Sequence, residues 1–167
     1  RNGGFVEGMW SHFRNLEKQH DQATALEIGH AAERSIGQIE EFLDERGIDA
    51  WFKQGGYMTV STSEAQDGAW DGQIEALGQA GVGEHAKVLD RAEVQAVCRS
   101  PRFREAALFD DTATIQPARL AFGLRQALID EGVMLFENSP VTAMNDSPSG
   151  VTVWTPGGKV TAGRAVL

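Results

Sequence analysis

The chain has 167 residues, and its 24 acidic and 15 basic residues give it a net charge of −9. The hydrophobic fraction of 41% is ordinary for a globular protein, and the length suits one domain with a real core. The negative charge argues against a nucleic-acid partner, because binding to phosphates needs clustered lysine and arginine, and it disfavours anionic membranes. No apolar run approaches the ~20 residues that a membrane helix needs.

Cysteine and histidine are too sparse for several kinds of site. The single cysteine, Cys98, cannot form an intrachain disulfide, so a reducing cytoplasm is the expected compartment. The four histidines show no metal-ligand spacing, and one cysteine cannot build a zinc site. The sequence also has no P-loop and no Gly-x-Ser-x-Gly nucleophile motif. We therefore expect no metal.

The N-terminal quarter is expected to be helical. Met9, Trp10 and Phe13 form an apolar cluster that is compatible with a short helical turn in an otherwise mixed segment. Residues 21–46 give the strongest helix signal, because apolar residues recur there with a period near 3.6 and charged residues fill the other faces. Gly47 is the stop signal.

Residues 51–62 read as a strand, an interruption and a second strand. The interruption, Gly55–Gly56, is either a hairpin turn or a bulge where another backbone approaches closely. Residues 63–80 then predict a helix that packs on a sheet, with Ser63 as N-cap, although three glycines weaken the pattern.

The run Gly81–Ala86 matches Gly-x-Gly-x-x-Ala, a dinucleotide-binding fingerprint. That fingerprint works only between a strand and a helix, where the pyrophosphate meets the helix N-terminus. Here a helix precedes the run and an expected strand, Lys87–Leu89, follows it, so we interpret the run as a loop. Asp90 then caps a short helix that ends at Val97.

The next segment carries several reactive residue types. For Cys98 a structural role is favoured, since no histidine or second cysteine is near it in sequence. Residues 99–104 include three arginines, which either face an acidic substrate group or form a solvated loop. Residues 106–109 predict a strand. Asp110 and Asp111 are adjacent, so their side chains point to opposite faces and shared acid–base work is not expected.

The C-terminal third alternates helix and strand. Pro117 suits the first position of a helix, leucines recur four residues apart from Leu120, and Gly132 suits a left-handed cap. The apolar run Val133–Phe136 predicts a strand buried on both faces, and Val141–Met144 begins another. A helix that crosses into a buried strand is typical of a layered α/β domain.

Beyond these elements the sequence predicts a β-meander. Residues 151–155 and 159–162 alternate in strand fashion, with turns at 145–150 and 156–158. We assign no chemistry to it.

Two stretches resemble the D-amino-acid oxidase-like family of FAD-dependent oxidoreductases, which includes glycine, sarcosine and γ-glutamylputrescine oxidases. In that family a loop ending in Asp-Pro-x-x-Leu opens a helix, a glycine ends it, and a strand and turn lead to a valine that contacts adenine. Here the loop ends in Gln116–Leu120, with glutamine where aspartate is usual, and the valine is Val141. The start, Arg1–Phe5, resembles the Ser-Gly-Arg-Asn-Gly-Gly run of the γ-glutamylputrescine oxidase branch.

The resemblance implies an α/β fold that is α+β in its substrate part. A partial FAD-binding Rossmann-like layer would carry an inserted antiparallel β-sheet substrate domain. Residues 1–48 would be an FAD-domain segment with the long helix, residues 49–112 the substrate-binding sheet, and residues 113–167 the return to the FAD domain with the meander. Both ends look cut, so we expect the chain to be the middle of a longer flavoprotein.

The implied reaction oxidises the C–N bond of a small amine or amino acid by hydride transfer to FAD, giving an imine. The family motifs assign cofactor contacts to five positions. Arg1 and Asn2 would contact flavin or pyrophosphate, Gly3 and Gly4 would let the backbone approach closely, and Val141 would bond adenine through its main chain.

The sequence gives weaker signals for the substrate. Tyr57, the sole tyrosine, is either a substrate contact or a plain sheet residue with a bonded hydroxyl. His12 is either a packed histidine bonded to backbone or an active-site residue. No catalytic residue can be assigned, and oxidase and dehydrogenase stay open. The alternative from another class is a small α+β binding or interaction module without a cofactor.

Overall fold

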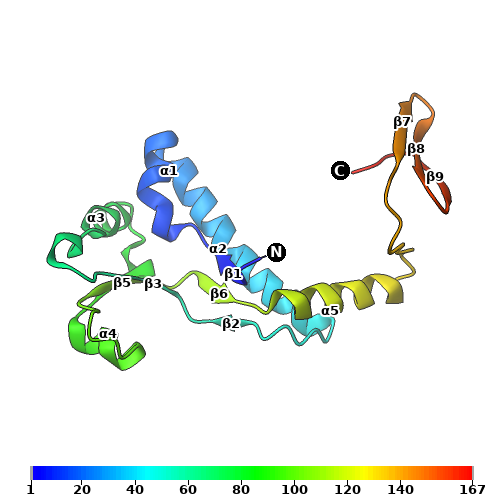
Figure 1. The fold of residues 1–167 in the computed structure, drawn as a ribbon. Coiled ribbons are helices and arrows are strands. Elements are labelled where there is room, and N and C mark those ends of the chain that lie inside the picture. The colour runs from blue at the N-terminus through cyan, green and yellow to red at the C-terminus, as the bar shows by residue number, and fades with distance from the viewer. Residues whose placement is uncertain (1, 167) are drawn as a thin grey trace. The chain divides into compact units, whose positions relative to one another are not determined.

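The computed structural model describes residues 2–166, and the chain divides into two compact units, residues 1–127 and 128–167. In the first unit helices surround two small antiparallel sheets, whereas the second unit contains one three-stranded sheet (Figure 1). The fold is thus a mixture of helix and sheet with antiparallel strands, as predicted for the substrate part. No helix within residues 2–166 is long and apolar enough to cross a membrane.

Five α-helices and three short 3-10 helices belong wholly or partly to the first unit. They are η1 (Trp10–His12), α1 (Phe13–Gln19), α2 (Gln22–Glu45), η2 (Glu64–Gln66), α3 (Asp71–Gln79), η3 (Gly83–His85), α4 (Arg91–Val97) and the first turns of α5 (Pro117–Asp130). The long helix α2 confirms the strongest sequence signal. Asp21 caps it by accepting a hydrogen bond from Thr24 N–H at 2.7 Å, and Gly47 follows its end with a φ of 61°.

The two sheets of the first unit contain three strands each. In the first sheet the strand order is β1 (Phe5–Glu7), β6 (Thr112–Thr114) and β2 (Lys53–Gln54). In the second sheet the order is β3 (Tyr57–Val60), β5 (Ala106–Phe109) and β4 (Ala86–Leu89). All four ladders are antiparallel, and Tyr57 and Ala86 both lie opposite Phe109. Because β5 runs directly into β6, residues 110–111 join the two sheets.

The glycine pair Gly55–Gly56 carries the chain from one sheet to the other, so the hairpin alternative is wrong and the close-approach alternative is confirmed. Both N–H groups donate to the carbonyl of Thr112, at 3.2 and 2.9 Å. Gly56 has a φ of 79°, and a Cβ there would lie 2.6 Å from the carbonyl oxygen of Phe109. The strand predicted at Trp51 begins only at Lys53, because Trp51 itself has a φ of 53°.

The main core lies between α1, α3 and β5. Trp10, Phe13 and Leu77 are completely buried there, and Trp70 and Phe109 complete the same cluster. The backbone of Trp10–His12 forms the 3-10 turn η1 and leads into α1, which confirms the helical turn predicted for the apolar cluster at residues 9–13. A smaller core under α4 is made by Leu89, Val94 and Ala106.

Asp111 ties the N-terminal segment to the junction of the two sheets. Its carbonyl accepts from Gly8 N–H at 2.8 Å, and its carboxylate, in a residue that is only 2% exposed, accepts from Trp10 N–H at 2.9 Å. Burial raises the pKa of Asp111 above its ordinary value, although the hydrogen bond from Trp10 acts in the opposite direction. Asp110 instead contacts Nδ1 of His85 at 3.1 Å, so the two carboxylates serve different partners.

The single helix predicted over residues 63–80 is wrong in its first half. Ser63 makes no side-chain cap, the 3-10 helix η2 follows it, and α3 begins only at Asp71. The physical reason is Gly68, whose left-handed φ of 70° breaks the helical backbone conformation between η2 and α3. Trp70 and Leu77 face the core as the spacing predicted.

The interpretation of Gly81–Ala86 as a loop between a helix and a strand is confirmed, because the short 3-10 turn η3 and then strand β4 follow α3. Strand β4 takes the place of the α-helix that the dinucleotide fingerprint needs after the run. Asp90 caps α4 as predicted and also forms a capping box with Glu93. Asp90 Oδ1 accepts from Glu93 N–H, and Glu93 Oε2 accepts from Asp90 N–H, both at 2.9 Å.

The second unit confirms the meander and corrects one strand. Strands β7 (Ala143–Ser147), β8 (Gly150–Thr155) and β9 (Gly158–Ala162) pair in order, all antiparallel. Val133–Phe136 forms no strand, and Met134 and Phe136 are 78% and 67% exposed, so the doubly buried strand is wrong here. A strand needs a hydrogen-bonded neighbour, and none of the described strands pairs with this run.

Candidate functional site

The N-terminal loop assigned to the cofactor is an exposed turn leading into β1. Arg1 lies outside the described residues. Gly4 N–H donates to Oδ1 of Asn2 at 2.6 Å, and the side chain of Asn2 thereby closes the turn. Gly4 has a φ of 81°, and a Cβ there would collide with the carbonyl oxygen of Ile115. The close approach that Gly4 permits is therefore to this chain's own backbone, whereas Asn2 and Gly3 are exposed.

The loop before α5 lies beside this turn. Ile115 N–H donates to the Gly4 carbonyl at 2.8 Å, and Gln116 N–H donates to the Ala50 carbonyl at 2.8 Å. Oε1 of Gln116 accepts from Arg119 N–H at 2.8 Å, which is the hydrogen bond of an N-cap to the third helical residue. Glutamine thus caps α5 in the place where the family carries aspartate, and Pro117 opens the helix as predicted.

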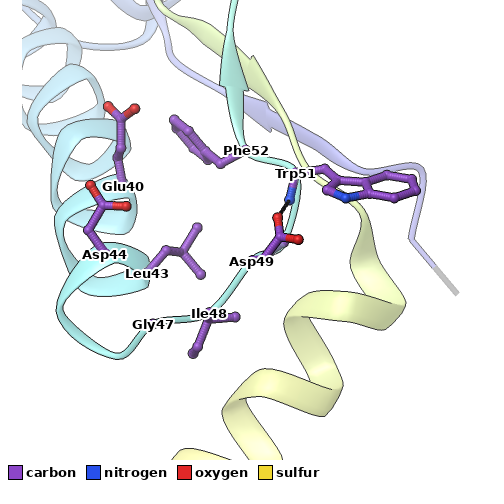
Figure 2. Close-up of a pocket in the computed structure, with 9 residues that line it drawn as sticks. Glu40, Leu43, Asp44, Gly47, Ile48, Asp49, Trp51 and Phe52 are labelled. Atoms are coloured by element: carbon purple, nitrogen blue, oxygen red, sulfur yellow. Dashed lines mark hydrogen bonds between the residues drawn. The ribbon is translucent and has the colours of Figure 1, made fainter.

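An aromatic side chain stands next to this loop in a strained backbone conformation. Trp51 has a φ of 53° and is 64% exposed, and the Arg119 guanidinium lies 4.7 Å from its ring centre. Arg119 is in turn fixed by Asp49, through Nε to the carbonyl at 2.6 Å and an ion pair to the carboxylate. A cavity of about 360 Å³ lies between the end of α2 and the segment that follows it, and Trp51 is among its lining residues. The ring of Trp51 points away from Glu40 and Asp44 on the other side of this cavity (Figure 2).

A second cavity, of about 350 Å³, brings together the two residues predicted to contact the substrate. We call it the α1–α3 cleft. Its lining comes from η1, α1, the β3–β5 sheet and the start of α3. The lining residues are Ser11, His12, Arg14, Asn15, Tyr57, Thr59, Ala69, Trp70, Gln73 and Phe109. His12 and Tyr57, far apart in sequence, thus share one cleft.

His12 is exposed, so the packed histidine is wrong. The reason is local: the turn at residues 10–13 directs Trp10 and Phe13 into the core and leaves His12 outside. Tyr57 is 42% exposed in β3.

The side chain of Gln73 holds the two walls of the cleft together. Its Nε2 donates to the Trp10 carbonyl at 2.6 Å, and its Oε1 accepts from Arg14 N–H at 3.1 Å. These two bonds connect α3 to the junction of η1 and α1, so the walls have a fixed spacing. A buried aromatic floor, made by Trp70 and Phe109, closes the cleft toward the core.

The sequence analysis missed Arg14, which lines both this cleft and a neighbouring hollow bordered by Gly72. A signal for it exists in Gly72, the second residue of α3, because glycine is a poorer helix former than alanine. A Cβ at Gly72 would lie 2.5 Å from Nη1 and 2.9 Å from Cζ of Arg14, so the glycine makes room for the guanidinium.

The arginine-rich loop has a structural role at one position. Arg104 makes a forked ion pair with Asp67, from Nε at 3.0 Å and from Nη2 at 2.7 Å to Oδ2. These hydrogen bonds lower the pKa of Asp67 and raise that of Arg104. Cys98 is a free, exposed thiol. No group of three or more histidine, cysteine or acidic side chains within residues 2–166 is arranged to hold a metal ion.

Val141, the residue assigned to adenine, is in the second unit and is 61% exposed. Strand β7 begins two residues later, and Thr142 N–H already donates to the Trp154 carbonyl at 2.9 Å. Neither main-chain polar group of Val141 makes a backbone hydrogen bond within residues 2–166. Its main chain is therefore available to a ligand.

Comparison with known proteins identifies the class. The family model described as FAD dependent oxidoreductase (DAO) matches residues 1–167. The chain therefore belongs to the DAO family of FAD-dependent oxidoreductases, and the cofactor of the family is FAD.

Individual relatives match the chain at low sequence identity. The chain is 25% identical over 169 residues to the probable oxidoreductase OrdL of Rhizobium meliloti (strain 1021), covering all of this chain and 39% of that protein. Glycine oxidase from Geobacillus kaustophilus matches with a TM-score of 0.67 at 19% identity, over 96% of this chain and 42% of that one. L-proline dehydrogenase from P. horikoshii matches with a TM-score of 0.61 at 19% identity, over 78% and 35%. The chain thus spans well under two thirds of each of these proteins.

The described residues fit the family's cofactor. Asn2 and Gly3 are exposed, and at Gly3 no side chain shields the backbone from a ligand. Val141 has free main-chain groups. A backbone without a side chain allows a ligand to approach closely, and free main-chain groups can form hydrogen bonds with it.

Proposed function

We propose that the protein oxidises the C–N bond of a small amine or amino acid by hydride transfer to FAD, giving an imine. The observation that carries this proposal is the match of the DAO family model to residues 1–167, with a glycine oxidase among the similar folds. When bound, FAD accepts the hydride from the carbon next to the substrate nitrogen. The chain's part is to bind and orient the two partners.

On this proposal the cofactor is held at both ends of the chain. Arg1 and Asn2 contact flavin or pyrophosphate, Gly3 permits close approach of the cofactor to the backbone, and Val141 bonds adenine through its main chain. Gly4, whose close approach is to Ile115 of this chain, shapes the loop instead. The exposure of Asn2 and Gly3 and the free main-chain groups of Val141 support these roles. The turn closed by the Asn2 side chain would keep the loop in one conformation as the cofactor binds.

The substrate contacts are proposed at His12 and Tyr57. Their shared cleft supports this pairing, because its aromatic floor excludes water and its polar rim can orient a small polar molecule. The same proposal divides the chain into FAD-domain residues 1–48, substrate-sheet residues 49–112 and FAD-domain residues 113–167. The lone free thiol, Cys98, fits the cytoplasm as the proposed compartment.

The test is a visible absorption spectrum of the full-length gene product, purified without added cofactor. A flavin spectrum that bleaches anaerobically with a small amine or amino acid is expected. Reoxidation by air would distinguish an oxidase from a dehydrogenase. A folded, colourless product that binds no added FAD would rule the proposal out and favour a binding module.

A further inference from the structure

The side-chain amide of Gln73 is inserted at the junction between η1 and α1. The Trp10 carbonyl accepts from Nε2 of Gln73 at 2.6 Å and also from Phe13 N–H, which is the pairing of a 3-10 helix. In an α-helix the same carbonyl would accept from Arg14 N–H, but that N–H donates to Oε1 of Gln73 at 3.1 Å. One amide from α3 thus occupies both atoms of an α-helical hydrogen bond that the chain does not make.

The two bonds lie on either side of His12. Their backbone partners are two residues before it and two residues after it. A side chain advances about 120° per residue in a 3-10 helix and about 100° per residue in an α-helix, so the winding of this turn decides where the imidazole points. Gln73 holds the winding that places His12 on the α1–α3 cleft.

The ring of His12 has no contact of its own that fixes its direction. It is exposed, it caps no N–H group of α1, and it makes no hydrogen bond or ion pair with residues 2–166. The side chains of Trp10 and Phe13 are completely buried and anchor the two ends of the turn. Between these anchors, the direction of His12 depends on the backbone that Gln73 bonds on both sides.

A glutamine is suited to this place, because its amide both donates and accepts hydrogen bonds as a peptide group does. Gln79, the last residue of the same helix, does not contact α1 through hydrogen bonds. Its Nε2 donates to Oε1 of Glu75 at 3.1 Å, within α3 itself. Gln79 also lies outside the lining of the α1–α3 cleft. The two glutamines therefore form a matched pair for experiment.

We infer that Gln73 is a positioning residue of the α1–α3 cleft, which acts on the substrate through His12 by holding the η1–α1 turn. The inference rests on the proposed function, in which His12 contacts the substrate. It adds a residue that sets the direction of this contact from another helix.

The kinetic experiment uses the full-length protein with glycine, sarcosine and L-proline as probe substrates. Gln73→Met removes the amide at nearly the same side-chain length. The value of kcat/KM for the best probe should fall at least about fivefold, because even small displacements of a substrate contact are costly. Gln79→Met should leave kcat/KM unchanged. If Gln73→Met does not fold, Gln73→Glu replaces it, since glutamate keeps the acceptor for Arg14 N–H and loses the donor to the Trp10 carbonyl.

A double-mutant cycle separates orientation from a general loss of structure. If Gln73 acts through His12, the double variant of Gln73→Met and His12→Ala should have the same kcat/KM as His12→Ala alone. The effects of Gln73→Met and Tyr57→Phe should instead multiply, because Tyr57 lies in β3. Unchanged kcat/KM in Gln73→Met or in His12→Ala, or effects of these two changes that multiply, would overturn the inference.

Hydrogen exchange followed by mass spectrometry tests the turn without turnover. In Gln73→Met the amides of residues 10–16 should exchange at least about fivefold faster, whereas those of α4 should not change, because α4 does not depend on this amide. A colourless protein that shows this local change would fail the proposed function and still support the positioning role of Gln73. Where none of the three probes is oxidised, unchanged exchange over residues 10–16 would overturn it.

Discussion

At the scale of single residues, Gly72 tests whether the side chain of Arg14 is free to move. Alanine there should gain up to about 1 kcal/mol of helix stability, because alanine is the better helix former. Its Cβ would meet the flexible end of Arg14, which can swing away at little cost. We therefore predict that Gly72→Ala leaves the melting temperature, measured by circular dichroism, unchanged or raised. Gly78→Ala, in the same helix over open space, is the control and should raise the melting temperature. A Gly72→Ala protein that melts below the wild type would show that the Arg14 side chain cannot move away from α3.

The buried carboxylate of Asp111 gives a second prediction at this scale. Because its folded pKa is raised above the ordinary 3.8, folding favours the protonated carboxyl. The stabilising contribution is complete below about that value and is lost as the pH rises through the raised pKa. The free energy of unfolding of the wild type, relative to Asp111→Asn, should therefore be greater near pH 4 than at pH 7. Urea titrations followed by tryptophan fluorescence measure this difference.

Asn at position 111 can still accept the Trp10 N–H, so the comparison isolates the charge. Asp21, Asp67 and Glu93 have lowered pKa values and lose their stabilising contribution as the pH falls, but both proteins share them. A difference that stays constant from pH 4 to 7, or that changes in the opposite direction, would contradict the assignment to Asp111.

At the scale of secondary-structure elements, the departure from the family motif at Gln116 can be tested directly. Its side chain caps α5, so Gln116→Ala should destabilise the first unit by about 1 kcal/mol. Gln116→Asp should recover most of this loss, because aspartate is a preferred N-cap residue. Thermal unfolding followed by circular dichroism measures both variants. An alanine variant as stable as the wild type would mean that Pro117 and the helix sequence suffice to start α5.

Elements with a local signal were predictable from the sequence. Helix α2 has an N-cap residue, a hydrophobic period of 3.6 and a terminal glycine, and helix α4 has Asp90 as its N-cap residue. Both helices formed as expected. Val133–Phe136 has an equally clear apolar signal, but a strand exists only beside a partner, and that partner is a non-local property. The role of Gly55–Gly56 depended in the same way on which strands pair, since β2 and β3 entered different sheets.

The candidate site was predictable in its parts and not in its assembly. Tyr57 and His12 were each weighed alone, and only the packing of α3 against η1 through Gln73 placed them on one cleft. Arg14 carried no motif, because a surface arginine on a short helix looks the same with or without a ligand. The glycine beneath it was visible in the sequence only as a weak helix former.

At the scale of the whole molecule, the two units differ sharply in how much they bury. The first contains Trp10, Phe13, Leu77 and other buried side chains, whereas within the described part of the second unit Val151 is the one buried hydrophobic residue. A three-stranded sheet with so little core opens locally at low free-energy cost, while core helices open only with the global transition.

We therefore predict that, in the 167-residue chain, backbone amides of β8 exchange with deuterium orders of magnitude faster than those of α2. The relative OrdL is more than twice as long as this chain. If further segments of the full-length protein cover Met134 and Phe136, the protection of β8 should be greater in that protein. Hydrogen exchange followed by mass spectrometry of peptides from both units measures this contrast. Equal protection of β8 and α2 in the 167-residue chain would mean that the small sheet is stabilised by more than its own buried surface.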